Sequence, residues 1–89
     1  MRILYLGIMK DDFQEPFNQM LMKMLHKVDT YGLSYQTNDD ISYYLNRLKG
    51  EIEEFEKNPS LDESLDIANF AIMMVYHLSK KGTESGQHV

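Results

Sequence analysis

The sequence predicts an all-α fold: a three-helix protomer with an antiparallel helix hairpin, assembling into an oligomeric helical bundle. Three observations support this prediction. Apolar residues recur at helical spacing in three successive segments. A break of only three residues, 58–60, separates the second segment from the third. The third segment is apolar on nearly all sides, and a chain of 89 residues is too short to cover it alone.

The first helix is predicted over residues 16–28. Pro16 fits the first turn of a helix, where its missing N–H costs nothing. Residues 1–15 form an N-terminal arm whose secondary structure the sequence does not decide. The run from Ile3 to Ile8 resembles a strand, but the sequence has no second strand to pair with it, so an extended or a helical arm remains possible. The predicted buried stripe of the first helix is Phe17, Met20, Leu21, Met24, Leu25 and Val28.

A loop with Gly32 is expected over residues 29–37, and the second helix is expected to run from 38 or 39 to Lys57. Thr37 or Asn38 is the predicted cap. The side chains of Tyr31, Leu33 and Tyr35 in this loop either cover a neighbouring pocket or close the core, and core closure is favoured. The predicted buried stripe of the second helix is Ile41, Tyr44, Leu45, Leu48, Ile52 and Phe55.

The third helix is predicted from Ser60 to about Lys80, with Gly82 as its terminator and residues 82–89 as a flexible tail. Ser60 and Glu63 have the spacing of a capping box. Residues 65–78 read LDIANFAIMMVYHL, which is typical of a buried helix. We therefore expect a homodimer or homotetramer with this helix near its centre, formed by the helical domain of residues 16–81.

Composition excludes several classes of protein. The chain has no cysteine, so disulfides and thiolate chemistry are absent. A net charge of −5 argues against binding to a nucleic-acid backbone. No segment resembles a membrane span or a convincing signal peptide, and a cytoplasmic location without membrane association is expected.

Half of the acidic residues, seven of 14, lie between Glu51 and Asp66. Glu51 and Glu54 are neighbours on one side of the second helix, and Glu63 and Asp66 are neighbours on the third. In an antiparallel hairpin the two pairs approach each other, and a hard divalent cation would relieve their repulsion. Arg47, four residues before Glu51, can neutralise one of them.

Each of these carboxylates also has a simpler interpretation. A pair of glutamates three residues apart arises by chance on any acidic helix. The Glu63 side chain could complete the Ser60 capping box, and Asp66 could be a hydrogen-bonded structural aspartate. Asp66 is the most informative of them, because its surroundings in the sequence are apolar.

The stretch from Leu45 to Leu78 resembles the MazG-like all-α nucleoside triphosphate pyrophosphohydrolases. That family carries E-x-x-E on one helix and E-x-x-D on the next, and these fall here on Glu51-Ile-Glu-Glu54 and Glu63-Ser-Leu-Asp66. The Asp66-x-x-Asn69 continuation is similar as well. The resemblance covers roughly residues 17–80. The eight residues between the motifs are fewer than the family usually has.

The resemblance implies hydrolysis of a nucleoside triphosphate to a monophosphate and pyrophosphate, as in cleansing of the nucleotide pool. Mg²⁺, or Mn²⁺ in its place, would be held by Glu51, Glu54, Glu63 and Asp66. Glu51 or Glu54 would act as the base for water. Asn69 would contact sugar or base. The candidate phosphate partners, from charge and position, are Arg47, Lys27, Lys23 and Lys49.

The main alternative is a catalytically inactive helical dimerisation or binding module of the same fold. A ferritin-like di-metal bundle is disfavoured, because no histidine follows a glutamate by three residues. A helix-turn-helix DNA-binding protein is disfavoured by the negative charge.

Overall fold

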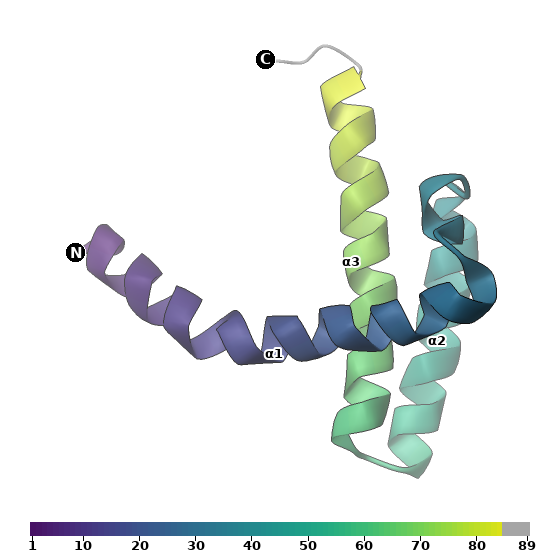
Figure 1. Cartoon of the computed structure of the whole chain (residues 1–89), viewed down its shortest axis with the longest axis horizontal. Helices are drawn as coiled ribbons and strands as arrows, with labels where there is room; N and C mark the ends of the chain where they lie inside the picture. Colours follow the sequence, from purple (N-terminus) through teal and green to yellow (C-terminus); the bar gives the residue numbers. More distant parts are fainter. Residues whose placement is uncertain (85–89) are drawn as a thin grey trace.

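The computed structural model describes residues 1–84, and all of its regular structure is helical. The elements are α1 (Arg2–Tyr31), the short 3₁₀ helix η1 (Ser34–Gln36), α2 (Ile41–Lys57) and α3 (Leu61–Glu84). No strand occurs in residues 1–84, which confirms the all-α class. Figure 1 shows α3 running back alongside α2 after the turn at 58–60, while α1 crosses this pair.

The N-terminal arm is helical, so the strand-like interpretation of residues 3–8 was wrong. α1 begins at Arg2 and passes through Pro16, which therefore lies inside the helix and not in its first turn. A proline removes one hydrogen bond of the helix and bends it, and α1 bends partway along its length (Figure 1). The apolar spacing of Phe17 and Met20 continues backwards through Phe13 and Met9, which is the pattern of one continuous helix.

α1 ends at Tyr31, three residues later than predicted, and Gly32 is its C-cap. This glycine has a φ of 61°, a conformation that side chains disfavour, and its N–H donates to the carbonyl of Val28 at 2.8 Å. The following loop is fastened to the helices by buried polar groups. The Tyr44 hydroxyl donates to the carbonyl of Asn38, and His77 Nε2 lies 2.7 Å from the carbonyl oxygen of Tyr35.

α2 is capped by Asp40, not by Thr37 or Asn38. The Asp40 carboxylate accepts from the backbone N–H of Ser42 at 3.0 Å. The helix also presents a different face from the predicted one. Leu45 and Ile52 are exposed, at 41% and 42%. The covered stripe is Ile41, Tyr44, Leu48, Glu51 and Phe55.

α3 begins as predicted and ends later. The Ser60 hydroxyl accepts from the backbone N–H of Glu63 at 3.1 Å, which caps the first turn. The helix continues through Gly82 to Glu84, so Gly82 does not terminate it. Of the predicted tail, residues 85–89 lie outside the described residues.

The described part of the chain buries few side chains completely. Met20 and Tyr44 are the buried apolar residues, and Asn69 and His77 are the buried polar ones. Most apolar side chains of α3 are only half-buried. Among residues 1–84, no helix combines the length and the apolar character needed to cross a bilayer.

Candidate functional site

Three carboxylates from two helices meet beside the turn at 58–60. Glu51 comes from α2, and Glu63 and Asp66 come from the first part of α3. One carboxylate oxygen from each lies within 4.8 Å of the other two. All three side chains are half-buried. The grouping therefore brings together three of the four residues that the sequence singled out for a metal.

The grouping follows from local structure. Glu51 lies on the stripe of α2 that faces α3, between Leu48 and Phe55. The Ser60 cap fixes the first turn of α3 through the backbone N–H of Glu63, so the capping bond leaves the Glu63 carboxylate available. Asp66 follows three residues later on the same side of α3.

Glu54 stands apart from this group. Its side chain is exposed, and it is not among the residues that cluster within 4.8 Å in the described part of the chain. The reason is the rotation of α2. The helix turns Glu51 inward, whereas the sequence placed Glu51 and Glu54 together on the flank of the stripe.

Glu51 has an unusual electrostatic environment. Its side chain is 16% exposed, and burial raises the pKa of this carboxyl above its ordinary value. The negative charges of Asp66 and Glu63 raise the pKa further. Arg47 Nη2, 3.9 Å from Glu51 Oε1, opposes the shift only in part. A carboxylate with a raised pKa accepts a proton more readily than an ordinary glutamate does.

Lys23 of α1 is the closest cation to the carboxylates. Its Nζ lies 2.9 Å from Asp66 Oδ1 and 2.8 Å from Asp62 Oδ1, and it also donates to the Asp62 carbonyl. Burial lowers the pKa of Lys23, but the hydrogen bonds to both aspartates outweigh burial and leave the pKa above its ordinary value. Lys23 is therefore charged and occupies one oxygen of a candidate metal ligand.

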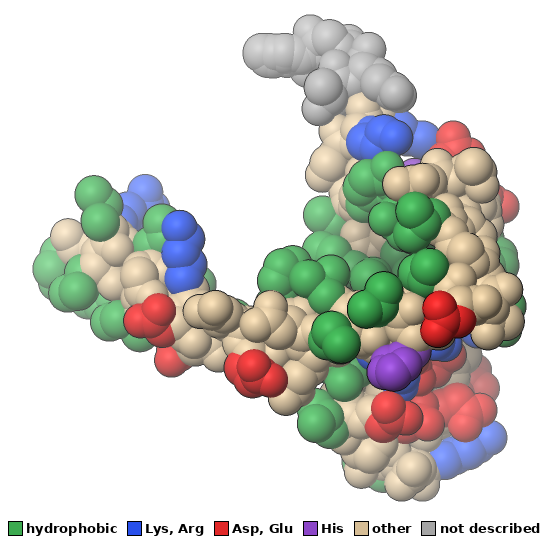
Figure 2. All heavy atoms as spheres, in the orientation of Figure 1, with side chains coloured by type: hydrophobic (Ala, Val, Ile, Leu, Met, Phe, Trp, Pro, Cys, Tyr) green, Lys and Arg blue, Asp and Glu red, His purple; other side chains and the backbone are tan. Residues whose placement is uncertain are grey.

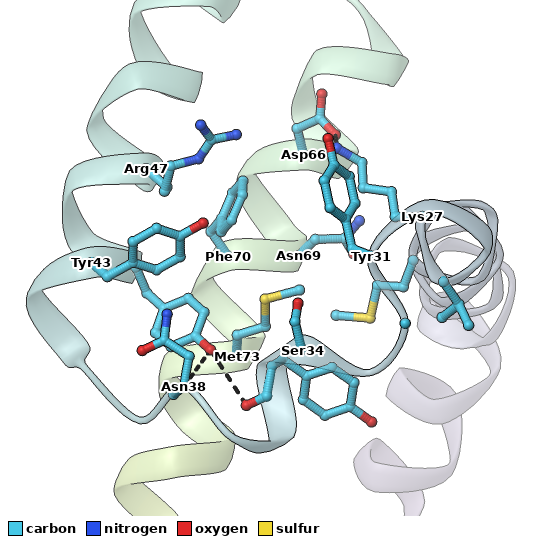
Figure 3. Close-up of a pocket in the computed structure, with 15 residues that line it drawn as sticks. Lys27, Tyr31, Ser34, Asn38, Tyr43, Arg47, Asp66, Asn69, Phe70 and Met73 are labelled. Atoms are coloured by element: carbon cyan, nitrogen blue, oxygen red, sulfur yellow. Dashed lines mark hydrogen bonds and ion pairs between the residues drawn. The ribbon is translucent and has the colours of Figure 1, made fainter.

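A pocket of about 450 Å³ adjoins the carboxylates. Asp66 belongs to both the acidic group and the pocket wall. Figure 3 shows the charged side chains of Lys27, Arg47 and Asp66 at one end of the pocket, and Ser34 and Asn38 toward the other end. Other residues of the wall are Tyr31, Tyr35, Tyr43, Asn69, Phe70 and Met73.

Asn69 is the most unusual residue of the pocket wall. It is 4% exposed, and its Oδ1 is buried without a hydrogen-bond partner. A buried polar atom left unpaired costs roughly 1–3 kcal/mol. Because Asn69 lines the pocket, a bound molecule could donate a hydrogen bond to this oxygen and so remove the cost.

The predicted phosphate partners are distributed unevenly. Arg47 and Lys27 line the pocket, and Arg47 lies over the ring of Phe70 at 5.2 Å from its centre. Lys27 Nζ is 4.0 Å from Asp66 Oδ1. Lys23 is absent from this pocket's wall and is tied to the two aspartates. Lys49 is exposed and is likewise absent from the wall.

The sequence did not identify several residues of the pocket wall. Tyr43 and Phe70 went unnoticed as pocket residues, although Tyr43 lies four residues before Arg47 and Phe70 follows Asn69 directly. Those spacings place them beside predicted site residues on the same helices. Tyr31, the last residue of α1, and Tyr35 of η1 line the pocket. The sequence had offered this role as the alternative to closing the core.

Comparison with known proteins identifies no relative. No protein-family model, no curated protein and no solved structure matches the chain.

Proposed function

We propose that the protein is a Mg²⁺-dependent nucleoside triphosphate pyrophosphohydrolase of the MazG-like kind, releasing a monophosphate and pyrophosphate. The observation that carries the proposal is the group of Glu51, Glu63 and Asp66, of which Asp66 also lines the charged end of a pocket with aromatic walls. The resemblance of the two motifs to that family supports it. A cytoplasmic house-cleaning role is proposed on the same basis.

The donor set suits a hard cation. Mg²⁺ prefers carboxylate oxygens at about 2.0–2.1 Å, so oxygens across one ion lie about 4.2 Å apart. The three carboxylates present oxygens within 4.8 Å of one another, and small side-chain rotations bring them into range. Mn²⁺ accepts the same ligands. Glu54, the fourth predicted ligand, is exposed and would need a new side-chain rotamer or a bound substrate to join them.

The pocket suits a nucleotide lying lengthwise. Arg47 and Lys27 at the charged end would bind phosphate oxygens, and Lys27 already lies within ion-pair distance of Asp66. The rings of Tyr31, Tyr43 and Phe70 offer faces and edges to a sugar or base. Asn69 offers its amide to a polar group of the same ligand.

Glu51 is the preferred base. Its pKa is raised by burial and by its acidic neighbours, which favours proton uptake from an attacking water. When bound, Mg²⁺ would stabilise the charge that develops on the phosphate oxygens. Arg47 would orient the same phosphates, being 3.9 Å from Glu51. Glu54, the other predicted base, is exposed and lies outside the acidic group.

The proposed assembly is a homodimer or homotetramer in which the α2–α3 hairpin builds a helical bundle. The half-buried apolar side chains of α3 support a partner on that helix. The alternative function is an inactive dimerisation or binding module. The tie between Lys23 and Asp66 favours this alternative, because it neutralises one candidate ligand without a metal.

A panel of nucleoside triphosphates with Mg²⁺ and detection of pyrophosphate tests the proposed activity. We expect release from at least one nucleotide, and loss of about two orders of magnitude or more in Asp66→Asn. Glu53→Gln, an exposed acid of α2 outside the acidic group, is the matched control and should retain activity. A protein that binds nucleotide but releases no pyrophosphate from any of them would establish the binding module instead.

A further inference from the structure

The first half of α1 carries an apolar stripe that nothing in the described chain covers. Every residue from Met1 to Asn18 is exposed. The residues at helical spacing along one side are each more than half exposed: Leu6, Met9, Phe13 and Phe17. The same stripe continues into Met20, which is 6% exposed where α1 packs on the rest of the chain. The continuous stripe is thus exposed up to Phe17 and covered from Met20 onward, where Met24 and Val28 are half-buried.

The N-terminal arm and the two residues after it form the first half of α1, residues 2–17, which is called the arm from here on. It leads away from the remainder of the molecule. Figure 1 shows this N-terminal half of α1 extending away from α2 and α3, and Figure 2 shows an open angle between the arm and the region around α3. At 1.5 Å per residue the arm is about 24 Å long. It is therefore long enough to reach across a neighbouring helix.

The exposed area of the chain matches a missing partner. The surface of the chain is 6831 Å². A folded monomer of 10.5 kDa exposes about 5,400 Å². The excess is about 1,400 Å², and at least about 600 Å² of it belongs to residues 1–84, because five residues such as 85–89 can contribute at most roughly 800 Å². A stable interface takes about 800 Å² from each partner, so the range fits one dimer contact.

A complementary surface lies on α3. At 100° per residue, the side of this helix opposite Asn69 and His77 carries only apolar side chains between residues 67 and 78. It includes Val75 and Leu78, which are 53% exposed, together with Ala68 and Ala71. The two alanines allow a second helix to approach closely. Because both bare surfaces belong to the same chain, two copies can cover each other with two-fold symmetry.

We propose that the arm is an exchange element: the arm of one copy packs its stripe across the bare side of α3 in a second copy, and receives the same contact in return. In each copy, the stripe that contains Met9 and Phe13 then packs on α3 of the other copy. The proposal does not depend on catalysis, so an inactive protein leaves it standing. It adds to the proposed oligomer the specific statement of which segments make the contact.

Sedimentation equilibrium of the full chain gives the first test. We expect twice the mass of 10.5 kDa for the wild type. The double variant Met9→Asp/Phe13→Asp should dissociate at least tenfold more readily. Gln14→Asp, on the polar side of the arm, should behave as the wild type. Circular dichroism establishes that each variant remains helical. A monomeric wild type, or a double variant that dimerises as well as the control, would overturn the proposal.

Introduced cysteines identify the contact itself, because the natural chain has none. Chains carrying Met9→Cys or Phe13→Cys are mixed with chains carrying Val75→Cys or Leu78→Cys, and the mixture is oxidised. We expect disulfide-linked dimers that contain one chain of each kind in at least one pairing. The same two cysteines placed in one chain should link between chains. A link formed only within a chain, showing an arm folded back at Pro16, or no link in any pairing, contradicts arm exchange.

Discussion

Asp66 is held between two lysines of α1, Lys23 and the more distant Lys27, and two other carboxylates. Lys23 lies 2.9 Å from its Oδ1, and an oxygen of Asp66 also lies within 4.8 Å of oxygens from Glu51 and Glu63. Asp66 is 14% exposed, so these charges interact with less screening than on an open surface. Either the ammonium group of Lys23 or an added metal ion can compensate the negative charge of the three carboxylates. At this scale the sequence predicted which acids matter but not that α1 supplies a competitor, because Lys23 is 43 residues away from Asp66 along the chain.

The competition gives a first prediction. Lys23→Met removes the internal cation while keeping the length of the side chain, so the acids bind Mn²⁺ or Mg²⁺ more tightly, by about tenfold, as a charged hydrogen bond of about 1.5 kcal/mol no longer has to be broken. Isothermal titration calorimetry measures the affinity. Lys49→Met, on the exposed surface of α2, is the control and should leave the affinity unchanged. Weaker metal binding by Lys23→Met would show that Lys23 organises the ligands and does not compete with the ion.

The raised pKa of Glu51 gives a second prediction, for metal-free protein. The folded chain holds this proton more tightly than the unfolded chain, whose value is about 4.5. Its contribution to stability is therefore present below that pH and is lost as the pH rises through the folded pKa. Glu51→Gln lacks this loss, so its stability relative to the wild type should increase as the pH rises above about 4.5. Urea unfolding with a chelator present measures the difference, and a difference that is flat or decreases with pH contradicts the assignment.

The unpaired oxygen of Asn69 gives a third prediction. Asn69→Leu removes a buried polar atom without a partner and keeps a similar volume, so the free energy of unfolding should increase by about 1 kcal/mol. Nucleotide binding should weaken in the same variant, because the residue lines the pocket. Denaturant unfolding and a nucleotide titration measure the two effects. Asn46→Leu, an exposed position of α2, should change stability by less than about 0.5 kcal/mol. A destabilised Asn69→Leu would show that the amide supports the fold.

At the scale of elements, the sequence predicted α2 and α3 well and α1 poorly. The Asn58-Pro59 break and the Ser60 cap are local signals, and they fixed the ends of two helices. The face of α2 could not be read from periodicity, because Glu51 occupies a covered position while the apolar Ile52 beside it is exposed. Pro16 misled the prediction of α1, because a proline can begin a helix or bend one, and only the longer apolar stripe decides between them.

The loop between α1 and α2 gives a fourth prediction. Tyr44→Phe removes the hydroxyl that donates to the carbonyls of Asn38 and Tyr35, so the chain should lose about 1 kcal/mol of stability. The backbone amides of residues 33–38 should exchange hydrogen faster, because the loop closes one end of the pocket. Tyr43→Phe is the matched control, since Tyr43 is exposed. Equal exchange in both variants would show that the Tyr44 hydroxyl does not fasten the loop.

At the scale of the whole molecule, the sequence predicted a homo-oligomer, and this assembly stays a prediction. The apolar segment over residues 65–78 was the signal, and most of its side chains are only half-buried in α3. The pocket could not be predicted, because its wall combines α1, the loop after it, α2 and α3. Such a wall depends on how α1 crosses the other two helices, and no periodicity in the sequence encodes that crossing.

The central claim is that acids from two helices bind one divalent ion, and a titration with Mn²⁺ followed by electron paramagnetic resonance tests it most directly. The account predicts one ion per chain in the wild type, and binding weakened at least tenfold by Glu63→Gln or Asp66→Asn. Glu53→Gln, an exposed acid of the same helix as Glu51, should bind as the wild type does. Absence of stoichiometric binding, or equal weakening by Glu53→Gln, would contradict the claim.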